Sequence, residues 1–123
     1  METTPQPSEI RLDRSRRLLK VAFDDGSLFE LSSEYLRVYS TSAEVKGHGS
    51  GEGILQTDKE NVKITEVQPV GNYAVRLIFD DGHNTGLYTW PYLYELGCEK
   101  EAKWKAYLAR LAAAGYAHRS ESE

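Results

Sequence analysis

The sequence predicts a small α+β domain: an antiparallel, hairpin-built sheet with helices on one face, including a C-terminal helix packed on it. Three observations lead to this fold class. Two hairpin patterns end in Asp-Asp-Gly, at Gly26 and Gly82. A short helix signal follows each pattern, and a longer amphipathic stretch lies near the end of the chain. With 123 residues, 40% of them hydrophobic, the chain can bury one core without disulfides or metals.

The two hairpins are copies of one pattern. Residues 18–26 resemble residues 73–82, because each run alternates apolar and polar residues and then reaches Asp-Gly, a strong signal for a hairpin turn. The second strand of each hairpin is expected at 27–31 and at about 85–88. We interpret the copies as two halves of one sheet, with one extra residue in the second turn region.

A short helix is expected after each hairpin. Ser32 and Thr89 are suitable N-caps, because their hydroxyls can accept hydrogen bonds from the first amides of a helix. Pro91 suits a first helical turn, where no backbone donor is needed. Between the two units, residues 62–67 predict a further strand, which residues 69–72 would turn into the second hairpin.

The C-terminal helix is expected over residues 99–114. Its apolar residues recur at helical spacing and form one stripe, and Gly115 is a typical residue just after a helix end. The stripe consists of Trp104, Tyr107, Leu108 and Leu111.

We expect a single domain over residues 9–117, with disordered ends at 1–8 and 118–123. Residues 41–53 hold four glycines around His48 and show no apolar periodicity, which predicts a mobile loop. This loop lacks the Lys-Ser/Thr pair of a P-loop and does not connect a strand to a helix, so we do not expect it to bind phosphate.

The composition excludes several classes of protein. The net charge is −4, whereas nucleic-acid and anionic-membrane binders need a basic surplus. No apolar run approaches the roughly 20 residues of a membrane span, and the N-terminus does not resemble a signal peptide. Cys98 is the single cysteine, so the chain cannot form an internal disulfide. We therefore expect a cytoplasmic protein.

The residue types of enzyme sites occur without usable spacing. Turn formation explains the acidic pairs Asp24-Asp25 and Asp80-Asp81. Because adjacent residues of a strand point to opposite faces, neither pair converges on one site. His48, His83 and His118 lack metal-site spacing, and nothing near Cys98 resembles the surroundings of an activated thiol. We therefore expect neither an enzyme nor a cofactor.

A longer signature covers residues 69–97, which include Gly-His-Asn-Thr-Gly-Leu-Tyr-Thr-Trp. Together with the upstream Phe-Asp-Asp-Gly, Leu-Ser-Ser-Glu-Tyr-Leu-Arg and Gly-His-Gly-Ser-Gly runs, it resembles the γ-butyrobetaine hydroxylase-like N-terminal domain family over about residues 9–100. The resemblance implies a zinc site of three cysteines and one histidine. Here segment 36–42 has no cysteine, and only His83 matches. We expect no structural zinc, and the weak metal candidates are His83, His48 and Cys98.

The resemblance also implies two functional settings. In one, the domain precedes a 2-oxoglutarate-dependent dioxygenase, whose barrel needs a much longer chain. In the other, similar domains are appended to Mrp-type P-loop ATPases that carry iron–sulfur clusters. We therefore predict a non-catalytic adaptor domain that contacts a protein partner in iron–sulfur cluster assembly or delivery, with an Mrp-type ATPase as the candidate partner. The sequence predicts no oligomeric state.

The preferred contact surface is the turn that carries His83, Asn84 and Thr85, with Tyr88 and Trp90 beside it. Exposed polar turns flanked by aromatic residues are typical of interfaces. Two alternatives stay open: His83 only forms hydrogen bonds within its own turn, and the aromatic residues only pack in the core. A second hypothesis is a small-ligand or metal-responsive domain, in which the mobile loop brings together His83, His48 and Cys98.

Overall fold

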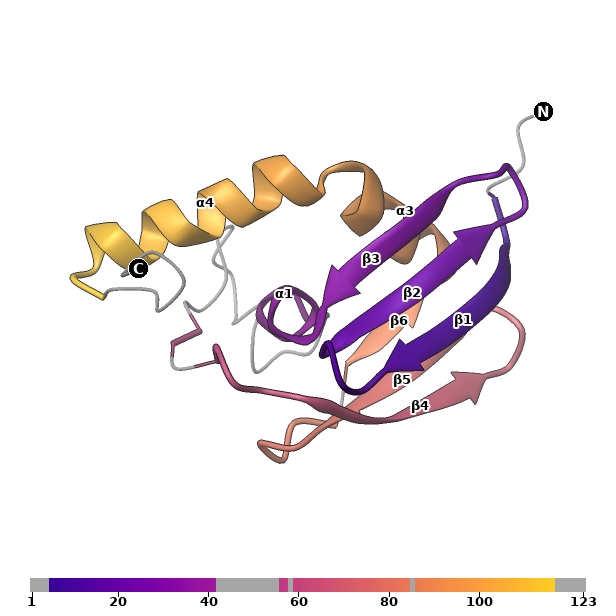
Figure 1. The fold of residues 1–123 in the computed structure, drawn as a ribbon, viewed down its shortest axis with the longest axis horizontal. Helices are drawn as coiled ribbons and strands as arrows, with labels where there is room; N and C mark the ends of the chain where they lie inside the picture. The colour runs from indigo at the N-terminus through magenta and orange to yellow at the C-terminus, as the bar shows by residue number, and fades with distance from the viewer. Residues whose placement is uncertain (1–4, 42–55, 58, 85, 117–123) are drawn as a thin grey trace.

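The computed structural model describes residues 5–41, 56–57, 59–84 and 86–116 (Figure 1). The predicted loop 41–53, apart from its first residue, therefore lies outside the described residues, as do His48, Thr85 and the tail at 118–123. The elements in chain order are β1 (Pro7–Asp13), β2 (Leu18–Phe23), β3 (Leu28–Ser32), α1 (Ser33–Val38), β4 (Ile64–Val70), β5 (Ala74–Phe79), β6 (Leu87–Thr89), α3 (Trp90–Cys98) and α4 (Lys100–Ala113).

The α+β class and the hairpin-built antiparallel sheets are confirmed, but the expectation of one sheet is wrong. The chain forms two three-stranded sheets, with strand orders β1-β2-β3 and β4-β5-β6. The strand predicted at 62–67 is observed as β4 and pairs with β5, whereas β1, which pairs with β2, was not predicted. Because β1 begins at Pro7, it also enters the segment expected to be disordered.

Side chains bond to backbone groups on the outer edges of β3 and β6. Lys100 Nζ donates to the Glu30 carbonyl oxygen of β3 at 2.9 Å. On β6, the Thr41 hydroxyl donates to the Leu87 carbonyl at 2.7 Å and accepts from the Leu87 amide at 3.1 Å. These edge groups are therefore already bonded, and no neighbouring strand is needed to pair them.

One core joins the inner faces of the two sheets with α1 and α3, and a smaller cluster of Val38, Tyr107 and Leu111 packs α4 against α1. From the first sheet, Leu19, Val21 and Leu31 are buried, and from the second, Leu77 and Tyr88. These residues belong to one continuous cluster. In Figure 1 the two sheets overlap in projection, with α1, α3 and α4 beside them. Alternation along each strand therefore directs one set of side chains inward and leaves the other set exposed.

The predicted N-caps of the two short helices are confirmed, and α4 lies within one residue of the predicted 99–114 at each end. The Ser32 hydroxyl accepts from the Tyr35 amide at 3.0 Å, and the Thr89 hydroxyl accepts from the Tyr92 amide at 3.3 Å. Pro91 lies in the first turn of α3. Helix α4 ends one residue before its C-cap, and Gly115 follows with φ of +89°, a conformation that favours glycine.

Candidate functional site

The two hairpin–helix units hold each other through equivalent contacts. Residues at matching positions of the units are 56 or 57 apart in the sequence. The Tyr94 hydroxyl of α3 donates to Asp25 Oδ2 in the first turn at 2.6 Å. At the matching positions, Arg37 Nε near the end of α1 donates to Asp81 Oδ2 in the second turn at 2.9 Å. Each Asp-Gly turn is therefore fastened to the helix of the other unit.

Asp81 is the centre of the more buried of these two contacts. Its carboxylate also accepts from Lys59 Nζ at 2.8 Å and from the His83 amide at 3.1 Å. Arg37 is only 7% exposed, and its Nη1 donates to Gln56 Oε1 at 3.1 Å. Burial by itself raises the pKa of Asp81, but the bonds from Lys59, the His83 amide and Arg37 outweigh it, and the pKa falls to about 2. The carboxylate is therefore ionised at neutral pH.

His83 lies inside the protein, not on an exposed turn. It is 4% exposed, and its Nε2 is 2.8 Å from the Ser40 hydroxyl, with which it forms a hydrogen bond. Its ring also contacts Phe79. Gly86 lies against this pair, because a Cβ at Gly86 would overlap Ser40 Oγ. The prediction that His83 is exposed is wrong, and the alternative of bonds only within its own turn is wrong too, because Ser40 follows α1.

The remaining residues of the predicted contact surface have different surroundings. Tyr88 is fully buried, and its hydroxyl donates to the Leu36 carbonyl at 2.6 Å, so it is a core residue. Trp90 is partly buried, and its Nε1 donates to the Asn72 carbonyl at 2.7 Å. Asn84 is exposed. Of the five predicted residues, only Asn84 and Trp90 thus have described surface that a partner could contact. The sequence did not reveal this, because aromatic spacing is the same in a core and at an interface.

The described part of the chain does not assemble the predicted metal candidates. Cys98 is exposed at the end of α3, whereas His83 is buried beside Ser40. Within residues 5–41, 56–57, 59–84 and 86–116, no group of three His, Cys, Asp or Glu residues has the arrangement of a metal site. A site that includes His48 stays a prediction, because that residue lies outside the described ranges.

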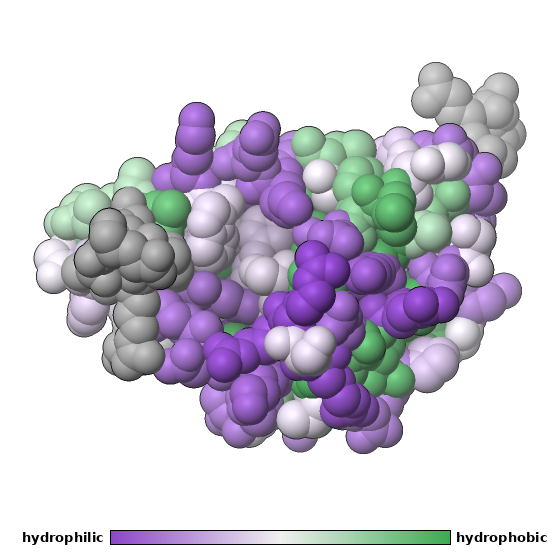
Figure 2. Space-filling view, in the orientation of Figure 1, coloured by the Kyte–Doolittle hydropathy of each residue, from purple (hydrophilic) through white to green (hydrophobic). Residues whose placement is uncertain are grey.

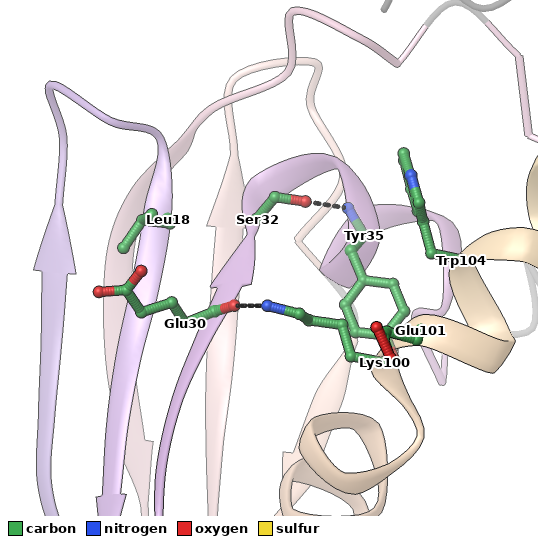
Figure 3. Close-up of a pocket in the computed structure, with 7 residues that line it drawn as sticks. All are labelled: Leu18, Glu30, Ser32, Tyr35, Lys100, Glu101 and Trp104. Carbon is green, nitrogen blue, oxygen red and sulfur yellow. Dashed lines mark hydrogen bonds between the residues drawn. The ribbon is translucent and has the colours of Figure 1, made fainter. Parts of the chain in front are cut away.

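A surface pocket of about 320 Å³ lies between β3 and the first turns of α4 (Figure 3). Apolar and aromatic side chains form one part of it, and charged side chains from both elements form the rest. The Tyr35 and Trp104 rings meet edge to face with centroids 6.2 Å apart. The lining residues are Leu18, Glu30, Ser32, Tyr35, Lys100, Glu101 and Trp104.

Charges surround the opening of this pocket. In Figure 3, Lys100 extends from α4 to the Glu30 carbonyl on β3, and Glu101 lies beside it. The Glu30 carboxylate is 3.4 Å from Arg16 and 3.9 Å from Lys20. Figure 2 shows the surrounding face as largely hydrophilic, with hydrophobic residues gathered where α3 passes β3. The sequence indicated Ser32 as an N-cap and Trp104 in the apolar stripe, but it did not predict the pocket, because the lining joins segments that are about 70 residues apart.

The comparisons with known proteins identify a family and relatives. The model of the family described as gamma-butyrobetaine hydroxylase-like, N-terminal, matches residues 10–94. One NMR solution structure is 45% identical and covers 94% of this chain and 90% of its own, with a TM-score of 0.81. A second NMR solution structure is 50% identical over 96% and 90% of the two chains, with a TM-score of 0.79.

A crystal structure from Acidithiobacillus ferrooxidans, of a protein of unknown function in the DUF971 family, is 44% identical. It covers 76% of this chain and 94% of its own, with a TM-score of 0.65. No curated protein matches the chain. In the part of the chain that the structure describes, no helix combines the length and apolarity needed to cross a membrane.

Proposed function

Because the chain belongs to the gamma-butyrobetaine hydroxylase-like N-terminal domain family, we propose that it is a non-catalytic domain that binds a protein partner. The pocket between β3 and α4 receives an apolar side chain of that partner. This pocket is the observation that supports the proposal, because Trp104 in its lining is partly exposed and stands against the buried ring of Tyr35. Partly exposed aromatic residues are frequent anchors of protein interfaces.

The environments of the polar residues support a non-catalytic role. Asp81 is bonded to Arg37 and Lys59, and His83 is bonded to Ser40. Each of these contacts joins segments that are far apart in the chain. A general base or nucleophile needs a partner group and an adjacent space for substrate, and neither of the two larger described pockets includes Asp81 or His83 in its lining.

The charges around the pocket suggest the character of the partner segment. Glu101 lines the pocket, and no salt bridge joins it to another residue in the described ranges. A partner segment with an apolar residue next to a Lys or Arg could fill the aromatic part and pair with this carboxylate. Rim charges of this kind affect the association rate and the specificity more than the affinity.

The finer proposal is that the partner acts in iron–sulfur cluster assembly or delivery, with an Mrp-type P-loop ATPase as the candidate. The support for this finer proposal is the family resemblance alone. A family does not by itself determine a function, so the partner has to be tested directly. The domain would then act by docking, since a cluster normally needs four ligands and the chain has one cysteine, Cys98.

The two tryptophans of the chain allow a direct test of function and surface. A Trp90→Phe variant keeps Trp104 as the fluorophore in the pocket, and a Trp104→Phe variant keeps Trp90 beside the predicted turn. Each variant would be titrated with a purified Mrp-type ATPase from the same cells. We expect a saturable blue shift for Trp90→Phe and no shift for Trp104→Phe, because only the pocket loses water on binding.

Charge reversal provides the matched control. Glu101→Lys should slow the formation of the complex several-fold and weaken its affinity less, whereas Glu66→Lys, the same change on the second sheet, should change neither. If only the Trp90 fluorophore responds, the partner contacts the surface around Asn84 and Trp90, and the assignment of the pocket is wrong. If neither fluorophore responds and no complex forms in size-exclusion chromatography, the adaptor role with this partner is wrong.

A further inference from the structure

A second pocket, of about 250 Å³, lies where the β1–β2 turn approaches the start of β4. In Figure 1 this turn is seen next to the chain that leads into β4. Arg17 Nη1 donates to Asn61 Oδ1 at 3.3 Å and thereby connects the two segments. The lining residues are Leu12, Arg14, Arg17, Ser33, Lys63, Ile64 and Thr65.

One residue of this lining, Ser33, carries a buried hydroxyl without a partner among the described residues. Ser33 is 1% exposed, and its Oγ forms no hydrogen bond among the described residues. It is the one buried side-chain oxygen or nitrogen in those ranges that lacks a bond. Since an unbonded buried hydroxyl is unfavourable, such a group requires an explanation. A ligand oxygen in the pocket would supply the missing bond.

In the second unit, a larger side chain stands at the position that matches Ser33. Ser33 and Trp90 are equivalent residues, and their amides donate to the equivalent carbonyls of Arg17 and Tyr73 at 2.8 and 3.1 Å. In the second unit, the larger side chain of Trp90 stands at this position, and its indole donates to the Asn72 carbonyl of the β4–β5 turn. In the first unit the side chain is small, and the space beside the β1–β2 turn stays open.

The charges of the open pocket have one sign. Arg14, Arg17 and Lys63 line it, and no carboxylate is among the lining residues. The chain as a whole is acidic, with a net charge of −4, whereas this pocket is lined by three cations. Arginine presents paired donors that match the oxygens of a phosphate, and lysine adds a mobile positive charge.

We infer that this pocket binds a phosphate group, either as free phosphate or as the monoester of a small molecule. A phosphate dianion has several acceptor oxygens, enough for Arg14, Arg17, Lys63 and the Ser33 hydroxyl, whereas a carboxylate has two. The volume lies just below the roughly 300–1,000 Å³ of pockets that enclose drug-sized ligands, which suits a small phosphorylated compound. This site does not depend on the proposed partner, because its lining shares no residue with the pocket between β3 and α4.

The inference is tested by NMR titration of the 15N-labelled full chain with inorganic phosphate, phenyl phosphate and acetate at constant ionic strength. We expect saturable shifts of the Ser33, Arg17 and Lys63 amides with phosphate and little change with acetate. Tighter binding of phenyl phosphate than of phosphate would indicate an ester ligand. Equal binding would indicate that the pocket recognises the phosphate group alone.

Matched variants separate this pocket from general charge attraction. Arg14→Gln and Lys63→Gln should each weaken phosphate binding at least five-fold, and Ser33→Ala at least three-fold. Arg16→Gln removes the same charge from the same turn, but Arg16 faces Asp13 and Glu30 and should leave binding unchanged. Non-saturable shifts, equal effects of acetate, or equal losses in Arg14→Gln and Arg16→Gln would overturn the inference. Arg14 and Lys63 are exposed, so their variants test it even if Ser33→Ala does not fold.

Discussion

The two hairpin–helix units share a backbone plan but differ in how their matching contacts are built. In both units the residue before the Asp-Asp-Gly turn, Phe23 or Phe79, donates its amide to the residue after the turn, at 2.8 and 2.9 Å. The carboxylate of each turn, Asp25 or Asp81, accepts a hydrogen bond from the helix of the other unit, α3 or α1. In the first unit it meets a neutral hydroxyl on the surface, and in the second it meets a buried guanidinium.

The difference extends to the close contacts at the helix ends. A Cβ at Gly97, at the end of α3, would overlap the ring of Phe29 on β3. Ser40, after α1, matches Gly97, and Gly86, before β6, matches Phe29. The glycine therefore lies at the helix end in one unit and beside the strand in the other. The space beside Gly86 then accommodates the bond between Ser40 and His83. The same plan therefore gives an aromatic contact in one half and a polar one in the other.

The largest expected effect comes from the two turn carboxylates. Asp81→Ala should lower the free energy of unfolding by about 3 kcal/mol, because it leaves Arg37 buried with a charge that only Gln56 contacts among the described side chains. Asp25→Ala should cost clearly less, because that carboxylate is on the surface and its partner is neutral. Urea unfolding of both variants measures the difference.

Removing the cation and the carboxylate together provides the control. Arg37→Met combined with Asp81→Ala should cost less than Asp81→Ala alone, because no unpaired charge is left in the interior. Equal losses in Asp25→Ala and Asp81→Ala would show that burial does not distinguish the two contacts.

Acid should destabilise the fold through the loss of the Asp81 contact. The pKa of Asp81 is about 2 in the folded protein, below its ordinary value of 3.8, so its contribution is complete above about pH 4 and is lost as the pH falls towards 2. A difference of this size corresponds to about 2 kcal/mol. Unfolding free energies measured between pH 2 and 6 should show a slope that Asp81→Asn reduces. An unchanged slope in this variant would contradict the assigned role.

Much of this plan was predictable from the sequence, because local rules determine it. Turn residues, N-caps and alternation predicted β2, β5, α1, α3 and α4 close to their observed bounds. Strand β1 was missed, because Pro7 and a polar start resemble a frayed end, and the two sheets were taken for one. The surface assignment depended on whether His83 and Tyr88 point outward. Their burial results from contacts with Ser40 and Leu36, which are more than 40 residues away.

The glycine contacts test whether the two halves tolerate added volume differently. Gly97→Ala should cost about 2 kcal/mol, because the Phe29 ring must move within a packed cluster. Gly86→Ala should cost about 1 kcal/mol, since the Ser40 hydroxyl can rotate away at the expense of its bond to His83. Thermal unfolding of both variants measures the order.

A second substitution sharpens the glycine comparison. In the Gly86→Ala background, Ser40→Ala should cost almost nothing more, because the hydroxyl that overlaps the new Cβ is gone. If the two losses simply add, Ser40 is not the residue that limits the size of position 86.

The smallest expected effects on stability come from two equivalent hydrogen bonds, one from a tyrosine of each unit, which have nearly the same length. The Tyr35 hydroxyl donates to the Leu96 carbonyl at 2.7 Å, and the equivalent Tyr92 hydroxyl donates to the Tyr39 carbonyl at 2.6 Å. Burial raises the pKa of Tyr92 to about 12, and it also raises the pKa of Tyr35. Both hydroxyls therefore keep their protons, and so their ability to donate, well into the alkaline range.

Tyr35→Phe and Tyr92→Phe should each lower the free energy of unfolding by about 1 kcal/mol, the typical contribution of one such hydrogen bond. Tyr116→Phe is the control and should change nothing, because Tyr116 is 50% exposed beyond α4. Chemical denaturation of the three variants gives the comparison. A loss in Tyr35→Phe several times that in Tyr92→Phe would mean that these bonds, too, have diverged. Equal losses would mean that the units differ at their turns and helix ends, while the bonds between their helices have kept equal strength.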